Sequence, residues 1–336
     1  MRSEKQWTTA TVTGIHPAAE DIRLFELEPE GGATPYKLGS HIDVALMVEG
    51  RSILRSYSVV GSAPVAGAWR IAVRRVGDSR GGSRAMWGLK HGDALRITRP
   101  RSHFELGFGR PEYVLVAGGI GITPILGMAD ALNRTKHRFR LLYAGRRRRQ
   151  MAFLTELEHL LGDRLQVFCS EEGSRIDLAG EIARLHREGE MYVCGPVQMM
   201  EAARELWRAS GRAPTSLRFE TFGSSGHLPL QPFTAKLQDH GIELHVSREQ
   251  SLLEALQNAG IEIAYDCLRG ECGLCQVTVL SHEGPVDHRD VFLSEVQKHA
   301  SHKLCACVSR GTGTITIDTG FRRELRGVLP RTPGGR

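Results

Sequence analysis

Three cysteines in the run DCLRGECGLC have the spacing of ligands to an iron-sulfur cluster. Four residues separate Cys267 from Cys272, and two separate Cys272 from Cys275. Plant-type [2Fe-2S] proteins have this spacing, and a distant fourth cysteine completes their site. Thiolates are soft ligands that suit iron, and Gly270 and Gly273 let the short loop bend around a cluster. A zinc site or a disulfide framework is less favoured, because zinc loops usually repeat a two-residue spacing in two separate pairs.

The fourth ligand is Cys305 or Cys307, which both lie in the stretch KLCACVSR. Cys275 is followed by 29 intervening residues before Cys305 and by 31 before Cys307. The shorter separation is closer to the ideal plant-type count. From spacing alone both positions stay open, and the cysteine that does not bind iron would be a spare thiol beside the cluster.

A second motif is the glycine-rich run VAGGIGITPILGM. It places Gly118, Gly119 and Gly121 between an apolar segment and a segment with helical spacing. The amide groups at the start of such a helix point back at the turn and can bind a pyrophosphate. Tight glycine turns also occur without a ligand, so the motif gains weight only from those that accompany it.

The segments around these motifs predict three modules. Residues 7–107 contain short strands broken by Gly, Pro and charged turns, a pattern typical of an antiparallel barrel. From residue 112 onward strand and helix alternate, which predicts a parallel sheet covered on both faces. The stretch 223–232 is rich in Gly, Ser and Pro and indicates a linker. A hairpin over 233–247, a helix ending at Gly260 and the cysteine loop then indicate the β-grasp fold of ferredoxins.

The composition is that of an ordinary globular protein of 336 residues, long enough for two or three domains. The amino terminus has no apolar run of signal-peptide length, and no segment approaches the roughly 18 apolar residues of a membrane span. Seven cysteines, four of them needed as reduced ligands, agree with a reducing compartment, so we expect a cytoplasmic protein. The arginine runs contain no aromatic residues, which disfavours nucleic-acid binding.

Other motifs resemble the ferredoxin-NADP reductase superfamily. RSYS at 55–58, GGS at 81–83 and YVCGP at 192–196 follow in the order of that superfamily. DHRDVFLSE followed by CVSR resembles the end of the ferredoxin domain in the phthalate dioxygenase reductase and vanillate O-demethylase reductase family, where the ligand directly precedes V-S-R. The resemblance covers residues 7 to about 320 and favours Cys307, with the two extra residues placed in the turn SHEGPV.

The resemblance implies a multidomain protein of α/β and β parts. Its expected parts are an FMN-binding antiparallel β-barrel (1–107), a Rossmann-like parallel α/β domain for NAD(P)H (108–224), a linker (225–232), a β-grasp [2Fe-2S] ferredoxin domain (233–322) and a flexible tail (323–336).

The resemblance also assigns residues to the flavin. Tyr57 and Ser58 would pack along its ring, with the Ser58 hydroxyl at the N5 edge. Arg55, Gly82 and Ser83 would hold its phosphate. The family carries FMN rather than FAD, and the short segment SRGGSRAMWG shows no obvious adenine-stacking insertion. The remaining expected flavin contacts are Ser56, Val73 and Gly81.

For the nicotinamide, the resemblance places Thr123 and Cys194 near the reacting carbon. Phe222 would cover the flavin face where the nicotinamide enters. An ordinary buried thiol is an almost equal alternative for Cys194. With Ser58, these three form the expected catalytic set. The other expected nucleotide contacts are Gly118, Gly119, Gly121, Pro124, Arg146, Gly195 and Pro196.

The nicotinamide donor is open between NADH and NADPH. Rossmann-type sites usually offer an acid to the ribose of NAD and an arginine to the 2′-phosphate of NADP. The run Arg146 to Arg149 follows a predicted strand and contains no acid, which leans towards NADPH. Family usage favours NADH, which we take as the expected donor.

These features predict an enzyme that takes a hydride from NADH onto FMN and releases single electrons through the cluster. By resemblance, the acceptor is the Rieske centre of a separate terminal oxygenase, and the chain is expected to be a monomer without membrane contact. One alternative is a reductase serving a cytochrome P450 or another acceptor. A redox sensor is a more remote alternative, because a sensor has no need of the flavin and nicotinamide motifs.

Overall fold

The computed structural model of the chain describes residues 6–48, 50–77, 81–222, 226 and 228–320. The chain divides into two compact units, Met1–Ser225 and Gly226–Arg336. The expected tail over 323–336 and part of the expected linker lie outside the described residues. Among the helices of the described ranges, none has the length and apolar character needed to cross a membrane.

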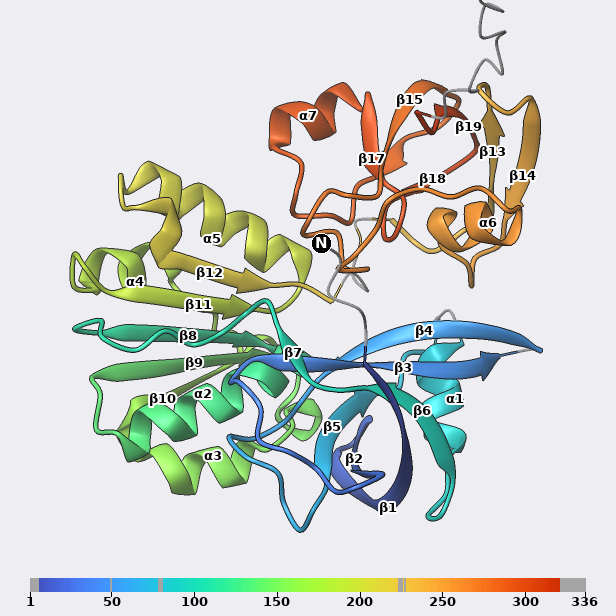
Figure 1. Cartoon of the computed structure of the whole chain (residues 1–336). Coiled ribbons are helices and arrows are strands. Elements are labelled where there is room, and N and C mark those ends of the chain that lie inside the picture. The colour runs from blue at the N-terminus through green and yellow to red at the C-terminus, as the bar shows by residue number, and fades with distance from the viewer. Residues whose placement is uncertain (1–5, 49, 78–80, 223–225, 227, 321–336) are drawn as a thin grey trace, which may run out of the picture. The chain divides into compact units, whose positions relative to one another are not determined.

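The first unit begins with the antiparallel barrel that the sequence predicts (Figure 1). Its strands follow the order β4-β3-β6-β1-β2-β5, and a bridge between Val59 and Ile71 closes the sheet after β4. Alternate residues of the strands, among them Val44 and Phe25, form the apolar core. The elements are β1 (Trp7–Ala19), β2 (Ile22–Pro29), β3 (Ser40–Val48), β4 (Arg51–Ser58), β5 (Trp69–Arg74), α1 (Gly82–Gly88), β6 (Ala94–Thr98) and β7 (Arg101–Ser102), which pairs with β3.

The second part of this unit is a parallel sheet of order β10-β9-β8-β11-β12, as predicted. Helices α2 and α3 cover one face and α4 and α5 the other (Figure 1). The elements are β8 (Tyr113–Gly118), α2 (Ile122–Arg134), β9 (Phe139–Gly145), α3 (Leu154–Leu161), β10 (Leu165–Cys169), α4 (Leu178–Arg184), β11 (Glu190–Cys194), α5 (Val197–Ala209) and β12 (Leu217–Glu220), with 3-10 turns at Gly119–Gly121, Arg148–Gln150, Gly162–Arg164, Ser170–Glu172 and Pro214–Ser216.

The second unit has the β-grasp arrangement that the sequence predicts. Its sheet has the order β14-β13-β19-β15-β17, in which β13 and β19 are parallel and the other pairs antiparallel. Helix α6 begins with a capping box between Ser251 and Glu254 and buries Leu252, Leu253 and Leu256 in the core. The elements are β13 (Phe233–Leu237), β14 (Ile242–Val246), α6 (Leu252–Asn258), β15 (Gln276–His282), β16 (Val286–Asp287), α7 (Glu295–Ala300), β17 (Lys303–Cys305), β18 (Arg310–Gly311) and β19 (Thr314–Asp318).

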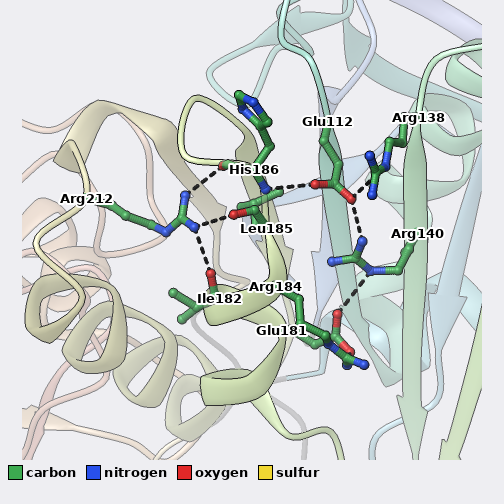
Figure 2. Close-up of polar contacts among 9 residues, drawn as sticks. All are labelled: Glu112, Arg138, Arg140, Glu181, Ile182, Arg184, Leu185, His186 and Arg212. Atoms are coloured by element: carbon green, nitrogen blue, oxygen red, sulfur yellow. Dashed lines mark hydrogen bonds and ion pairs between the residues drawn. The ribbon is translucent and has the colours of Figure 1, made fainter.

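A buried ion-pair network lies at the amino-terminal edge of the parallel sheet (Figure 2). Glu112 is 1% exposed and accepts hydrogen bonds from Arg140 at 2.5 Å and from the His186 amide at 2.8 Å. Arg138 lies 3.3 Å from the same carboxylate, and Arg140 also contacts Glu181 at 3.1 Å. The glycine turn after β8 lies at the opposite edge, so we assign this network to stability rather than to chemistry.

Replacing Glu112 with Gln should therefore destabilise the fold. Burial acts to raise the pKa of Glu112, but the hydrogen bonds from the His186 amide and Arg140 outweigh it and lower the pKa below its usual value. The ionised carboxylate then stabilises the fold above the unfolded pKa of about 4.3, and this stabilisation is lost as the pH falls through the lower folded pKa. We expect the free energy of unfolding to fall by about 2 kcal/mol at neutral pH.

Urea denaturation measures this effect. The difference between the parent and the variant should shrink when the pH is lowered below about 4. Glu188→Gln is the control, because Glu188 is exposed and precedes β11, the strand that pairs with the β8 strand that follows Glu112. Equal stabilities of the parent and Glu112→Gln at neutral pH would show that the carboxylate charge contributes nothing to the fold.

Candidate functional site

A phosphate-sized cradle forms where β4 meets the start of α1. The side chain of Arg55 packs on Gly82, where an added Cβ would lie 2.9 Å from the arginine Cγ and Nε. Gly81 has φ 81°, no side chain caps the helix, and its first turn holds no acid. The Ser83 hydroxyl accepts from the Val76 amide at 3.2 Å and keeps its own proton for donation. A cation, the start of a helix and a hydroxyl together fit an anionic group.

The barrel and the parallel sheet meet at Ser58. Its hydroxyl donates to the carboxylate of Glu220 at 3.2 Å, and the two residues are only 4% and 0% exposed. Ser58 ends β4 and Glu220 ends β12, so this hydrogen bond joins the two parts of the unit, as the bond between Ser62 and Asp130 also does. Burial raises the pKa of the neighbouring Tyr57 well above its usual value, so the phenol stays protonated. Sequence reasoning missed Glu220, whose sequence signal is a single acid between the two phenylalanines of FETFG.

Two expected flavin contacts lie in the barrel wall. The Ser56 hydroxyl donates to Asp43 at 2.5 Å, and Arg101 contacts the other oxygen of the same carboxylate at 2.9 Å. Val73 is 2% exposed and belongs to the barrel core. These side chains support the strands that carry Arg55 and Ser58, and a direct contact of either with flavin stays a prediction.

The expected nucleotide-binding residues come together at the carboxyl ends of β8 and β11. A Cβ at Gly121 would overlap the carbonyl oxygen of Cys194, and one at Gly118 would lie 2.6 Å from Pro196 and 3.2 Å from the Cα of Gly195. Only glycine permits this close approach of the two loops. Gly119 has φ 55°, and no side chain caps α2. The turn therefore has the shape and open amides that a pyrophosphate requires.

The expected catalytic side chains surround this turn. Thr123 is 2% exposed and donates to the Ile120 carbonyl at 3.0 Å, and Pro124 follows it in the buried first turn of α2. Cys194 is fully buried at the end of β11. Phe222 is partly buried and packs against the same apolar core as Cys194. The structure thus brings Thr123, Cys194 and Phe222 into one region of the first unit.

The arginine run at 146–149 follows β9. Arg146 is exposed, and its carbonyl accepts from the Cys169 thiol at 3.2 Å and from the Glu171 amide at 3.1 Å. The other three arginines each lie 2.9 Å from a carboxylate, and their partners are, in order, Glu171, Glu172 and Glu20. Two of these acids follow β10, so the acids absent from the run itself come from the neighbouring strand.

The cysteine loop of the second unit bends through residues with positive φ. Gly270 and Gly273 have φ 75° and 71°. A Cβ at Gly270 would lie 2.6 Å from Val308, and one at Gly273 would lie 2.5 Å from the ring of Phe292. The amides of Arg269 and Glu271 donate to the Cys267 sulfur at 3.4 and 3.3 Å. Amides aimed at a sulfur stabilise a thiolate, as an iron ligand requires.

The cysteine sulfurs converge. Hydrogen bonds from Cys272 and Cys307 lower the pKa of Cys267 far below its usual value despite burial. Hydrogen bonds from Cys305 and Cys307 lower the pKa of Cys275 to about 4. Cys307 therefore contacts sulfurs on both sides of the loop, Cys267 and Cys275. The contact of Cys305 with Cys275, its burial and the negative charge of Asp290 raise the pKa of Cys305.

The described residues contain no group of three or more His, Cys, Asp or Glu arranged around a single metal ion. This does not conflict with a two-iron cluster, because each iron would take only two of the four thiolates. The loop, the amide donors and the convergent sulfurs fit such a cluster.

Buried polar residues fasten the loop to the rest of the unit. Asp290 is 0% exposed and accepts from the Ser309 hydroxyl at 2.9 Å and from the Leu293 amide at 2.8 Å. The amide of Val291 donates to the Gly270 carbonyl at 3.0 Å. Arg310 donates to the carbonyls of Gln231, Ser247 and Gln250. The DHRD and V-S-R segments, which the sequence offered only as a family likeness, are therefore structural supports of the loop.

Three family models match successive parts of the chain. An oxidoreductase FAD-binding domain matches residues 9–106, and an oxidoreductase NAD-binding domain matches residues 115–205. A 2Fe-2S iron-sulfur cluster binding domain matches residues 235–312. The three matches follow the order of barrel, parallel sheet and β-grasp domain.

Relatives and solved structures match nearly the whole chain. It is 37% identical over 310 residues to the heme-dependent oxidative N-demethylase beta subunit of Ectopseudomonas mendocina (strain ymp). The match covers 91% of this chain and 97% of that protein. It is 34% identical over 317 residues to the vanillate O-demethylase oxidoreductase of Pseudomonas putida, and this match covers 92% of this chain and 98% of that protein. The structure of phthalate dioxygenase reductase superposes on this chain with a TM-score of 0.74 and 28% sequence identity. The superposition covers 93% of this chain and 98% of that protein.

The fold, the site and the matched domains define an oxidoreductase that uses a flavin, a nicotinamide nucleotide and a [2Fe-2S] cluster. The chain belongs to the phthalate dioxygenase reductase and vanillate O-demethylase reductase family.

Proposed function

We propose that this protein is the reductase component of a two-component oxygenase system. It takes a hydride from NADH onto FMN and passes single electrons through a [2Fe-2S] cluster to a Rieske-type terminal oxygenase. The observation that carries the proposal is the convergence of Cys267, Cys272, Cys275 and Cys307 in a chain that also contains joined flavin and nucleotide sites. The vanillate O-demethylase and phthalate dioxygenase relatives support it.

The cofactors supply the conversion from a two-electron donor to a one-electron carrier. The chain holds them in place. Glu220 orients the Ser58 hydroxyl, both groups are buried, and Thr123 and Cys194 line the nucleotide turn. Burial of this region excludes water, so a hydride can move without loss to solvent.

The flavin is FMN in this proposal. Arg55, Gly82 and Ser83 form one anionic cradle, which suits the single phosphate of FMN. The first helix after it is short and ends at Gly88, and family usage points in the same direction.

The nicotinamide donor in this proposal is NADH. Carboxylates engage Arg147, Arg148 and Arg149, which reduces the positive charge available for a 2′-phosphate. Within the described residues, Arg146 is the one member of the run whose side chain makes no ion pair. Family usage also favours NADH.

Cys307 is the fourth ligand in this proposal, since it contacts sulfurs on both sides of the loop. Plant-type clusters have potentials near about −400 mV and Rieske centres at about −150 mV or above. The two potentials differ by about 250 mV. At 59 mV per tenfold change, this difference favours the equilibrium for electron transfer from the cluster to the Rieske centre by about four orders of magnitude. The direction from flavin through the cluster to the oxygenase is therefore downhill at its last step.

A haem-containing acceptor is the second candidate. The relative from Ectopseudomonas mendocina is named as the beta subunit of a heme-dependent N-demethylase. Anaerobic rapid mixing of the NADH-reduced protein with a purified Rieske-type oxygenase and, separately, with a purified haem-containing oxygenase distinguishes the two. Reduction of a Rieske centre supports the first proposal, and reduction of a haem supports the second. We also propose that the protein acts as a monomer in the cytoplasm, where its ligand thiols stay reduced.

Cofactor analysis tests the chemical core of the proposal. Acid release from the purified protein should yield FMN, with about one flavin and two irons per chain. NADH should bleach the flavin and cluster absorbance under anaerobic conditions. Recovery of FAD would refute the FMN assignment, and zinc in place of iron would refute the electron-transfer role.

A further inference from the structure

Part of the predicted linker is fastened to the second unit by a buried arginine. Arg289 is 4% exposed, and it contacts one carboxylate oxygen of Asp287 through Nε at 2.7 Å and through a terminal nitrogen at 2.6 Å. The same terminal nitrogen donates to the Leu228 carbonyl at 2.8 Å. Gly226 lies against this side chain, because an added Cβ there would lie 2.4 Å from the arginine Nε. Asp287 therefore holds the arginine that holds the linker.

A second buried arginine fastens the linker further along the chain. Arg310 is 3% exposed and donates to the Gln231 carbonyl at 3.0 Å. The same side chain donates to the carbonyls of Ser247 and Gln250, which follow β14. All of these residues belong to the second compact unit. The linker is thus attached to that unit from Gly226 onward, before the first strand of the unit begins.

These attachments shorten the chain that joins the two units. Phe222 packs against the apolar core of the first unit, and three residues separate it from Gly226. The four Cα steps between them can extend to at most ~14 Å. If the linker were released as far as Gln231, nine Cα steps would separate Phe222 from the next attached residue, and these could extend to ~32 Å. The contacts of Arg289 therefore more than halve the reach of the connection.

We propose that Arg289 is a positioning residue that keeps this connection short and thereby speeds electron transfer from the flavin to the cluster. The inference rests on the proposed function, in which one electron leaves the reduced flavin and enters the oxidised cluster. The effective concentration of a tethered group falls roughly as the −3/2 power of the tether length, once the tether exceeds the distance that it must span. A change from four to nine Cα steps lowers the effective concentration about threefold.

Two variants of the full chain lengthen the connection by the same amount. Arg289→Met removes the guanidinium group, keeps most of the side-chain length, and releases the linker as far as Gln231. Insertion of five Gly and Ser residues directly before Gly226 also gives nine Cα steps, and it leaves both arginines in place. Agreement between the two variants would therefore reflect the length of the connection and not the loss of a buried charge.

Flash photoreduction of the flavin starts the transfer without NADH, so a slow hydride step cannot mask it. The rate at which the cluster is reduced, measured from its visible absorbance, should fall about threefold in both variants. Rapid mixing with NADH should show flavin bleaching at the parental rate, and the flavin and iron contents should be unchanged. Arg289→Lys should stay closer to the parent, because an ammonium group can still donate to Asp287 and Leu228.

Arg212→Met is the matched control. Arg212 also fastens a loop through main-chain carbonyls, among them that of His186, but it does so within the first unit (Figure 2). We expect this variant to leave the rate of flavin-to-cluster transfer unchanged.

Subtilisin digestion gives a second measurement that needs no cofactor. Mass spectrometry should find new cuts between Gly226 and Gln231 in Arg289→Met, whereas cuts in the insertion variant should fall within the inserted residues. The inference would be overturned by a parental transfer rate in the insertion variant, or by the absence of new cuts between Gly226 and Gln231 in Arg289→Met. If Arg289→Met lost iron, the insertion variant would decide alone, because it leaves the second unit unchanged.

These failures are distinct from a failure of the proposed function. A parent protein whose reduced flavin passed no electron to a cluster would show that the proposed function is wrong. A parent that transfers electrons at the same rate as both lengthened variants would count against the inference alone.

Discussion

Replacement of Cys307 with Ser should abolish the [2Fe-2S] cluster. Cys307 is the residue whose sulfur contacts both Cys267 and Cys275, so its loss opens the site between them. Changes to the surroundings of metal ligands cost about 10- to 100-fold in affinity, and loss of a ligand itself should cost more. We expect the purified variant to lose most of its iron and the visible absorbance of the cluster, while its flavin spectrum remains.

Cys305→Ser is the matched control, because it makes the same cysteine-to-serine change two residues earlier in the chain. It should retain two irons and a nearly unchanged absorbance spectrum. Flavin reduction by NADH should continue at the parental rate in both variants, since the flavin and nucleotide residues belong to the other compact unit. Retention of iron in Cys307→Ser together with its loss in Cys305→Ser would show that the plant-type spacing outweighs the contacts of Cys307.

Local patterns of the sequence predict most of the fold. The alternation of buried and exposed residues in 7–107 and the apolar runs of the parallel strands reflect periods that a few residues reveal. Short or atypical elements give a weaker local signal. Strand β12 has four residues, one of them the buried Glu220, and α1 begins and ends with glycine. Propensity gives little weight to such segments, and only their packing in the tertiary structure forms them.

The candidate site likewise contains residues that local sequence predicts and residues that only the tertiary structure reveals. The cysteine loop and the glycine turn are recognisable because their ligands lie within one short segment. Glu220 is not recognisable, because its partner Ser58 lies 162 positions away and no local pattern links the two. The choice between Cys305 and Cys307 also depends on tertiary contacts. The two cysteines lie two positions apart in the sequence, and only the turn between β17 and β18 decides which sulfur meets Cys267.

Removal of the chain from Gly226 onward should leave a flavoprotein that still oxidises NADH. The first unit contains the residues assigned to the flavin and the nucleotide, and it is compact without the second. Hydride transfer requires only these residues, so NADH should bleach the flavin at its normal rate, and ferricyanide should reoxidise it directly. Transfer to cytochrome c or to the terminal oxygenase should fall to background, because the proposed exit for single electrons is the cluster.

Full-length Cys307→Ser is the matched control for this truncation, because it removes the cluster but keeps the chain. Rapid-mixing absorbance should give the same flavin bleaching in the parent, the truncated protein and Cys307→Ser, and only the parent should support the oxygenase. A defect in the truncated protein alone would mean that the second unit acts through its surface and not through its cluster. Full support of the oxygenase by the truncated protein would mean that electrons leave directly from the flavin, and the order of nicotinamide, flavin, cluster and acceptor would then be wrong.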